Sequence, residues 1–322
     1  MSSPGALARR NAKLTVVGAG SVGTSLAYAA LIRGVAREVA LYDIDEPKVE
    51  AEVLDLAHGT QFTGASQISG GADPAVAAGS HLIVITAGAK QKPGQTRLDL
   101  AETNGGILRT LLPALLEHAP EAIYCIVTNP CDVLTVAAQQ ISGLPTERIF
   151  SSGTVLDTSR LRRLLADRAG VSTASVHADI VGEHGDSEFA LWSQARIGPV
   201  PILDWVSPEG DHFSYAELEQ LTDAVRGAAY RVIEGKGATN YAIGLAGARI
   251  AQAILHDEHA VLPVSTVHRG YRGLDGVALS VPSVVTARGV EHVLDLTMSA
   301  AEERSLHASA EALLATQRTL GL

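Results

Sequence analysis

The stretch Lys13–Gly34, KLTVVGAGSVGTSLAYAALIRG, decides the fold. Its apolar run KLTVV leads into GAGSVG, which places Gly18, Gly20 and Gly23 at the G-x-G-x-x-G spacing ahead of a helical pattern. The first glycine of such a turn permits a sharp bend, the second lets the backbone approach a pyrophosphate, and the third lets the helix pack on the strand. The sequence therefore predicts a strand, a phosphate-binding turn and a helix.

An acidic residue follows at the spacing that this turn requires. Asp43 ends the next apolar run, EVALYD, about twenty residues after the last glycine. Its carboxylate would accept hydrogen bonds from ribose hydroxyls and repel a 2′-phosphate, which favours NAD over NADP. The alternative is a glycine-rich turn without a ligand, and the agreement of strand, helix and acid argues against it.

Residues 13–151 alternate between strand and helix patterns. The expected strands are continuous apolar runs, as in a parallel sheet covered by helices on both faces. They are KLTVVG, EVALYD, HLIVITAG, AIYCIVT and ERIF. This order of elements predicts an α/β fold, with a Rossmann-type doubly wound parallel sheet.

After residue 151 the pattern changes. It indicates a helix at TVLDTSRLRRLLADRAG, antiparallel strands over 175–201, long helices around 214–256, and strands around VLPVSTV and GVALSVPSVV. Ser299 and Glu302 form a predicted capping box for a last helix. We expect a flexible tail over residues 1–12, an NAD-binding Rossmann domain over 13–151, and a mixed α+β catalytic domain over 152–322.

Composition excludes several classes of protein. The 322 residues carry a formal net charge of −10 and no long basic run, which argues against nucleic-acid binding. No apolar run approaches the roughly 18 residues of a membrane span, and the N-terminus does not resemble a signal peptide, so the cytoplasm is expected. Cys125 and Cys131 suit neither a disulfide framework nor a metal site. We expect both to be buried thiols, and no metal.

Several catalytic motifs are absent from the sequence. It contains no G-x-S-x-G elbow, no G-x-x-x-x-G-K-[ST] loop, no H-E-x-x-H, and no tyrosine four residues before a lysine. Hydride transfer to a nicotinamide needs instead a proton donor or acceptor, a charge that polarises a carbonyl, and a group that holds the substrate.

His184 is the first candidate for the proton. It lies in VGEHGDSE between Gly182 and Gly185, which allow a sharp turn and a close approach to a ligand. A lone histidine is more often structural than catalytic, so a catalytic role requires a partner for His184. Asp157 and Arg160, three residues apart on an expected helix, share one face.

This pair suits a catalytic role. Asp157 could bond one nitrogen of His184 and favour the imidazolium, and the Arg160 fork suits a carboxylate. The same pair could instead be an exposed ion pair on the helix surface. Arg162 lies about 200° around the helix from Arg160 and cannot share its site, so it is a solvated cation or serves a second surface.

Five motifs in this order resemble the NAD-dependent L-lactate and malate dehydrogenase family. They are GAGSVG, ITAGAKQKPGQTRLDL, VTNPCDVLT, LDTSRLR and GEHGDSE. The resemblance runs from about Lys13 through the last helix. It implies reversible hydride transfer between NAD and a 2-hydroxy acid.

The resemblance also implies roles for individual residues. His184 would be the acid/base, Asp157 would orient it, and Arg160 would bind the substrate carboxylate. Arg97 would close over the substrate and polarise its carbonyl. Asn129 would contact both the substrate and the nicotinamide side. The positions that match cofactor contacts are Gly18, Gly20, Val22, Gly23, Asp43, Lys48, Gly88, Ala89, Thr128, Asn129 and Ser152.

Gln91 bears on substrate choice. Similar malate enzymes have arginine at this position, so a second substrate carboxylate would face no cation here, at a cost of several kcal/mol. Thr239 matches a pocket position that is also threonine in similar lactate enzymes. Pyruvate and L-lactate are therefore expected, with malate or a bulkier 2-hydroxy acid as the alternative. Gln95 and Ala238 depart from the family's common residues near the site.

Arg162 and His177 match positions where allosteric bacterial members of the family bind fructose 1,6-bisphosphate between subunits. The resemblance thus implies activation by this effector and a homotetramer. The alternative is a surface arginine and a histidine at a strand end. A non-catalytic NAD-binding redox sensor is a further alternative, but it would have no need of His184, Asp157, Arg160 and Arg97 together.

Overall fold

The computed structural model describes residues 11–64, 66–89, 97–207 and 209–322, with Arg97 described by its backbone alone. Most of the expected N-terminal tail, together with Gln91 and Gln95, lies outside these ranges. Among the described helices, none has the length and apolar character needed to cross a bilayer.

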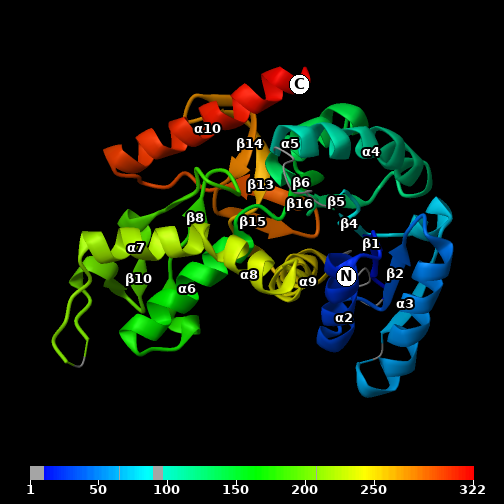
Figure 1. The fold of residues 1–322 in the computed structure, drawn as a ribbon, viewed down its shortest axis with the longest axis horizontal. Helices are drawn as coiled ribbons and strands as arrows, with labels where there is room; N and C mark the ends of the chain where they lie inside the picture. The colour runs from blue at the N-terminus through cyan, green and yellow to red at the C-terminus, as the bar shows by residue number, and fades with distance from the viewer. Residues whose placement is uncertain (1–10, 65, 90–96, 208) are drawn as a thin grey trace, which may run out of the picture.

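A parallel sheet forms the centre of the molecule (Figure 1). Its strands lie in the order β3-β2-β1-β4-β5-β6. They are β1 Lys13–Val17, β2 Glu38–Tyr42, β3 Gln67–Gly71, β4 Leu82–Ile85, β5 Ile123–Ile126 and β6 Ile149–Ser151. The strand order reverses between β1 and β4, where open α/β sheets bind their ligands. The predicted doubly wound sheet is confirmed.

β3 has no counterpart among the strands expected from the sequence. Its residues, QISGG, include no fully buried side chain, because β3 is the edge strand next to β2. Gly70 is needed for close packing, since a Cβ atom there would lie 2.5 Å from the Leu41 carbonyl oxygen. The strand is thus specified by its neighbour β2, and its own sequence has no apolar run.

Two strands from the second half of the chain extend this sheet. They are β13, Ser265–Tyr271, and β14, Leu274–Ser280, which form an antiparallel hairpin. β13 pairs with β6 through Ser265 and Ser151. The expected strands in this part of the sequence are therefore present, and β13 and β14 among them belong to the central sheet and extend it past residue 151.

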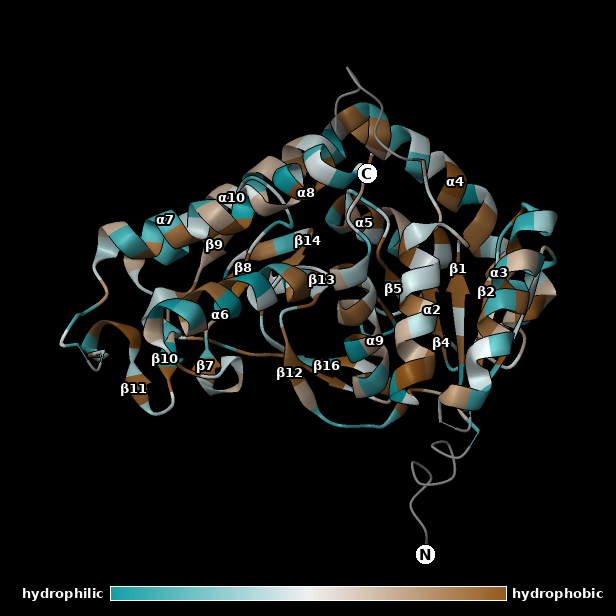
Figure 2. Cartoon of the chain, turned by 60° about the horizontal axis from the view of Figure 1, so that its bottom comes forward, coloured by the Kyte–Doolittle hydropathy of each residue, from teal (hydrophilic) through white to brown (hydrophobic). Residues whose placement is uncertain are grey.

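Helices cover both faces of the sheet (Figures 1 and 2). One face packs against α2 Ser21–Arg33, α3 Glu46–Gly59 and α9 Tyr241–Leu255, and the other against α4 Arg97–His118 and α5 Cys131–Ser142. Gly244 of α9 allows close contact with α2, because a Cβ atom there would lie 2.9 Å from Ser25. Cys125 and Cys131 are buried and free, as expected.

The rest of the chain forms an α+β region beside the sheet. Its elements are α6 Val155–Ala169, β7 Val176–His177, β8 Ile180–Val181, β9 Phe189–Ala190, β10 Arg196–Ile197, β11 Val200–Pro201, α7 Tyr215–Arg226, α8 Ala228–Lys236, β12 Ala260–Leu262, β15 Ser283–Thr286, β16 Gly289–Val293 and α10 Ala300–Leu320. The Ser299–Glu302 capping box is present at the start of α10. This helix packs through Leu306, Ala310 and Leu313 in one apolar cluster with β14.

Candidate active site

In the glycine turn after β1, packing requires Gly18 and Gly23 but does not require Gly20. Gly18 has φ +102°, and a Cβ atom on Gly23 would lie 1.9 Å from the Gly18 carbonyl oxygen, so both positions require glycine for packing. Gly20 has extended backbone angles and caps α2, and a Cβ atom there would meet nothing within 4 Å. The open space in front of this helix N-terminus is where a pyrophosphate would lie.

Asp43 lies directly beside this turn. Its carboxylate accepts a hydrogen bond from the Ala19 backbone N–H at 2.7 Å and another from the Asp45 N–H at 3.1 Å. Lys48 Nζ lies 3.7 Å from the same carboxylate. Val22, in the first turn of α2, packs against the core below. The Asp43 carboxylate and the groups around it fit a dinucleotide whose ribose carries no 2′-phosphate.

The turns after β4 and β5 are joined by Asn104, a residue that sequence reasoning missed. Its side chain is buried on α4, accepts from the Ala89 N–H at 2.7 Å and donates to the Asn129 carbonyl at 2.8 Å. Its partners are backbone groups 15 and 25 residues away, so no local pattern could reveal them. Two turns with predicted cofactor positions are thereby held together.

The remaining predicted cofactor positions lie at the same edge of the sheet. A Cβ atom on Gly88 would lie 2.4 Å from Thr128 Cγ2, so glycine lets these turns touch. Thr128 donates to the Ala87 carbonyl at 2.7 Å. Ser152 follows β6 and donates its N–H to the Ile126 carbonyl at 3.0 Å.

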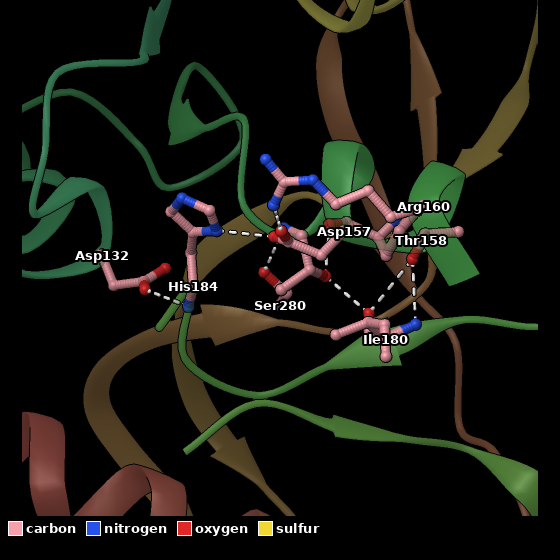
Figure 3. A network of polar contacts seen from close by, with 9 residues as sticks. Asp132, Asp157, Thr158, Arg160, Ile180, His184 and Ser280 are labelled. Atoms are coloured by element: carbon pink, nitrogen blue, oxygen red, sulfur yellow. Dashed lines mark hydrogen bonds and ion pairs between the residues drawn. The ribbon is translucent and has the colours of Figure 1, made fainter. Parts of the chain in front are cut away.

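Asp157 joins the predicted acid/base to the predicted carboxylate-binding arginine (Figure 3). One of its oxygens lies 2.6 Å from His184 Nδ1, and the other lies 2.5 Å from an Arg160 guanidinium nitrogen. The Asp157 side chain is 2% exposed and that of Arg160 is 18% exposed. The alternative of a surface ion pair is therefore wrong.

Three elements hold this group rigidly (Figure 3). Thr158 of α6 accepts from the Ile180 N–H of β8 at 2.9 Å. Gly182 and Ser280 of β14 exchange backbone hydrogen bonds at 2.9 and 2.8 Å. Gly182 has φ +89° and touches Ser309, where a Cβ atom would lie 2.8 Å from Oγ. The turn that carries His184 is fixed on both sides.

Asp132 was not anticipated either. It is buried in the first turn of α5, and its carboxylate accepts the His184 backbone N–H at 2.8 Å. Burial raises the pKa of Asp132 to about 6. The contact spans 52 residues and involves the histidine backbone, so sequence spacing gave no signal for it.

The charges of the site favour a protonated histidine. The Asp157 carboxylate raises the pKa of His184 to about 9, although burial opposes this shift. Burial would raise the pKa of Asp157, yet the His184 and Arg160 cations hold it below its usual value. At neutral pH the site thus presents an imidazolium and a guanidinium on one carboxylate.

Other predicted residues are placed less completely. Arg97 begins α4, and its side chain is not described. Thr239 and Ala238 are half-buried in the connection between α8 and α9. The Tyr230 hydroxyl of α8 donates to Asp186 at 3.2 Å, and Asn240 donates to Ser25 Oγ at 2.9 Å. The connection therefore lies between the His184 turn and α2.

Arg162 points away from the dyad, as its helix position predicted. Its guanidinium donates to the Ala178 carbonyl at 2.9 Å and pairs with Asp179 at 2.8 Å. His177 is exposed on β7, two residues before this aspartate. The ion pair between Arg162 and Asp179 was not predicted from the sequence.

Two family models match the chain. The model of the lactate/malate dehydrogenase NAD binding domain covers residues 12–151, and the model of the family's alpha/beta C-terminal domain covers residues 154–319. The chain belongs to the lactate/malate dehydrogenase family. The family recognised from the five motifs is thus confirmed, as is NAD as the cofactor of this oxidoreductase.

The chain is similar to L-lactate dehydrogenases over almost all of its length. That of Bifidobacterium animalis subsp. lactis is 48% identical over 310 residues, 96% of this chain and 97% of that protein. That of Thermus aquaticus is 42% identical over 309 residues, 96% and 99% of the two chains. The structure of a lactate dehydrogenase from a Medee basin deep-sea metagenome library matches with a TM-score of 0.93 and 39% identity, covering 97% of this chain and 99% of that one.

Proposed function

We propose that this enzyme interconverts pyruvate and L-lactate. The observation that carries the proposal is the Asp157 carboxylate, which binds His184 and Arg160 at once. This arrangement sets a proton donor and a carboxylate-binding cation side by side at the carboxyl edge of the sheet. When bound, NAD supplies or accepts the hydride of the reaction.

The hydrogen bonds of His184 and Arg160 support a task for each of these side chains. Because His184 Nδ1 faces Asp157, its Nε2 is the nitrogen that would give a proton to the carbonyl oxygen during reduction and remove it during oxidation. Arg160 has one nitrogen on Asp157, and the rest of its fork is available to a substrate carboxylate. Arg97 would stabilise charge on the substrate oxygen from the first turn of α4.

The substrate carries one carboxylate in this proposal. Arg160 would bind it, and neutral Gln91, outside the described residues, would leave a second carboxylate without a cation. The test compares kcat/KM for pyruvate, oxaloacetate and 2-oxoisocaproate with NADH. Pyruvate should lead, and Gln91→Arg should move the preference toward oxaloacetate. An unchanged preference in the variant would reject the role of Gln91.

We also propose activation by fructose 1,6-bisphosphate at Arg162 and His177 in a homotetramer. Half-buried Arg162 and exposed His177 both lie beside Asp179, and an arginine fork suits a phosphate. Asp179 already occupies part of the Arg162 guanidinium, so the phosphate would have to displace it. The effector should lower the apparent KM at low pyruvate. Identical saturation curves between about pH 5.5 and 7.5 would reject this part of the proposal.

We propose that residues 13–151 bind the cofactor and that residues 152–322 supply most of the substrate site. We also propose that the enzyme acts in the cytoplasm.

A further inference from the structure

A third carboxylate lies against the His184–Asp157 pair. Glu188 is 2% exposed, and one of its carboxylate oxygens, one of Asp157 and one ring nitrogen of His184 all lie within 4.8 Å of one another. Among the described residues, Glu188 forms no ion pair of its own. The reaction outlined above gives it no task.

Strand geometry explains why Glu188 faces the site. It directly precedes β9, where Phe189 packs in the cluster that contains α10, and Ala190 packs in the cluster that contains α6. Side chains alternate along a strand, so Glu188 shares the side of Ala190 and faces α6. Asp157 and Arg160 lie on that helix.

The turn between β8 and β9 fixes this position. The Glu188 N–H donates to the Gly185 carbonyl at 3.3 Å, and the Glu188 carbonyl accepts from Arg226 Nε of α7 at 2.9 Å. On the same turn, Ser187 donates to the Glu183 carboxylate and lies 3.0 Å from Ser309 Oγ of α10. His184 and Glu188 are thus held at opposite ends of one braced turn.

A metal site does not account for this cluster. His184 Nδ1 and Asp157 Oδ2 lie 2.6 Å apart, which is a hydrogen-bond distance and too short for two ligands of one ion. The Arg160 guanidinium on the other Asp157 oxygen would also repel a dication. Proton chemistry is the better account.

We propose that Glu188 is a positioning residue whose carboxylate acts on the His184–Asp157 pair and governs when His184 holds its proton. The proposal rests on the proposed function, in which His184 exchanges a proton with the substrate. Glu188 touches neither substrate nor cofactor in it. Once Glu188 is ionised at mildly alkaline pH, its carboxylate acts through its charge on the imidazolium.

The charges around Glu188 support this assignment. Burial, followed by the Asp157 charge, raises the pKa of Glu188 to about 8, while His184, Arg160 and Arg226 oppose the shift. The charges of Asp157, Glu188 and Asp132 all raise the pKa of His184. Glu183 faces Asp132 from the same turn. The charge of Glu188 therefore raises the pKa of His184, and the charge of His184 lowers that of Glu188.

The test uses Glu188→Gln, which keeps the shape and removes the charge. The pH profile of kcat/KM for pyruvate reduction should move to lower pH, with a several-fold loss of rate on its alkaline side. Diethyl pyrocarbonate acylates neutral imidazole, so its rate of inactivation of the cofactor-free enzyme should rise several-fold at mildly alkaline pH. Glu188→Asp should lie between the two, and Glu311→Gln, on the exposed face of α10, should match the wild type.

Unshifted profiles in a folded Glu188→Gln enzyme would overturn the proposal. If that variant does not fold, the wild type still decides: its infrared spectrum should show a protonated carboxyl band that disappears on alkaline titration, and absence of the band overturns the proposal. His184→Asn separates this test from the proposed function. If His184→Asn stays active, the proposed function fails; if it is inactive and Glu188→Gln is unshifted, only the present inference fails.

Discussion

The Asp157 carboxylate, 2.6 Å from His184 Nδ1, keeps the imidazole protonated at neutral pH, and the same carboxylate fixes Arg160. Because the folded-state pKa of His184 is about 9 and its ordinary value is 6.5, the stability from this pair is complete below about pH 6.5 and disappears as pH rises through 9. Proton donation to pyruvate should follow the same window. Asp157 thus contributes to the stability of the fold, orients His184 and Arg160, and sets the pH range of pyruvate reduction.

Asp157→Asn should narrow the pH range of reduction. The amide cannot stabilise the imidazolium, while burial still disfavours it, so the pKa of His184 should fall well below 9. At neutral pH, kcat/KM for pyruvate should drop by about 100-fold or more, the scale of lost acid catalysis. Steady-state rates across pH check this. An alkaline limb that stays in place would contradict the role of Asp157.

Arg160→Lys should impair substrate binding while it retains the charge. A lysine cannot bind Asp157 and a substrate carboxylate with one planar fork. Loss of one charge-assisted pair, about 2–3 kcal/mol, predicts a fall in kcat/KM of about 30- to 150-fold. Arg163→Lys is the control, because Arg163 forms an exposed ion pair with Asp167 on the same helix. Equal effects of the two substitutions on kcat/KM would argue against a role of Arg160 in binding the substrate carboxylate.

Gly20→Ala and Gly23→Ala should separate cofactor binding from folding. At Gly20 a methyl group meets no protein atom within 4 Å, so thermal stability should be nearly unchanged while the Kd for NADH rises tenfold or more, as expected for about 1.4 kcal/mol. At Gly23 the methyl group would lie 1.9 Å from a backbone oxygen, so Tm should fall by several degrees. Differential scanning fluorimetry and NADH fluorescence titration measure both. An unchanged Kd for NADH in Gly20→Ala would show that the pyrophosphate does not bind at this turn.

Sequence reasoning predicted the elements whose patterns are local. The strands β1, β2, β4, β5 and β6 were predictable from buried apolar runs, and the glycine turn from its spacing. The contact of Asp157 with His184 was also anticipated, because a helix face and a glycine-flanked histidine constrain both. The physical reason is that burial on both faces of a parallel sheet leaves a continuous apolar signal.

The missed features all depend on distant partners. β3 has no apolar run because it lies at the sheet edge, and β13 joins β6 across more than a hundred residues of sequence. Asp132 and Asn104 act on backbone groups of other turns. Glu188 was visible in GEHGDSE, but only the pairing of β8 with β9 turns it toward α6.

His268 should limit stability in acid. It is 2% exposed, its Nε2 lies 3.1 Å from the Leu279 carbonyl, and burial lowers its pKa to about 4. Between pH 6.5 and 4, His268 is protonated in the unfolded chain but stays neutral in the folded chain. The free energy of unfolding therefore falls by up to about 3 kcal/mol as pH drops. His268→Gln should lose less stability than the wild type over this range in denaturant titrations. His307→Gln, exposed on α10, should follow the wild type.

If fructose 1,6-bisphosphate binds at Arg162 as proposed, Asp179→Asn should strengthen the activation. The Asp179 carboxylate pairs with Arg162 at 2.8 Å and would repel a phosphate, so its removal should lower the half-activating concentration by about three- to tenfold. Burial raises the pKa of Asp179, so acid should protonate it and release Arg162 in the wild type as well. The difference between variant and wild type should therefore shrink as pH falls. Asp167→Asn, which breaks the exposed pair with Arg163 on the same helix, is the matched control. Activation curves at several pH values decide the matter: if the two aspartate variants respond alike, Asp179 does not restrain Arg162.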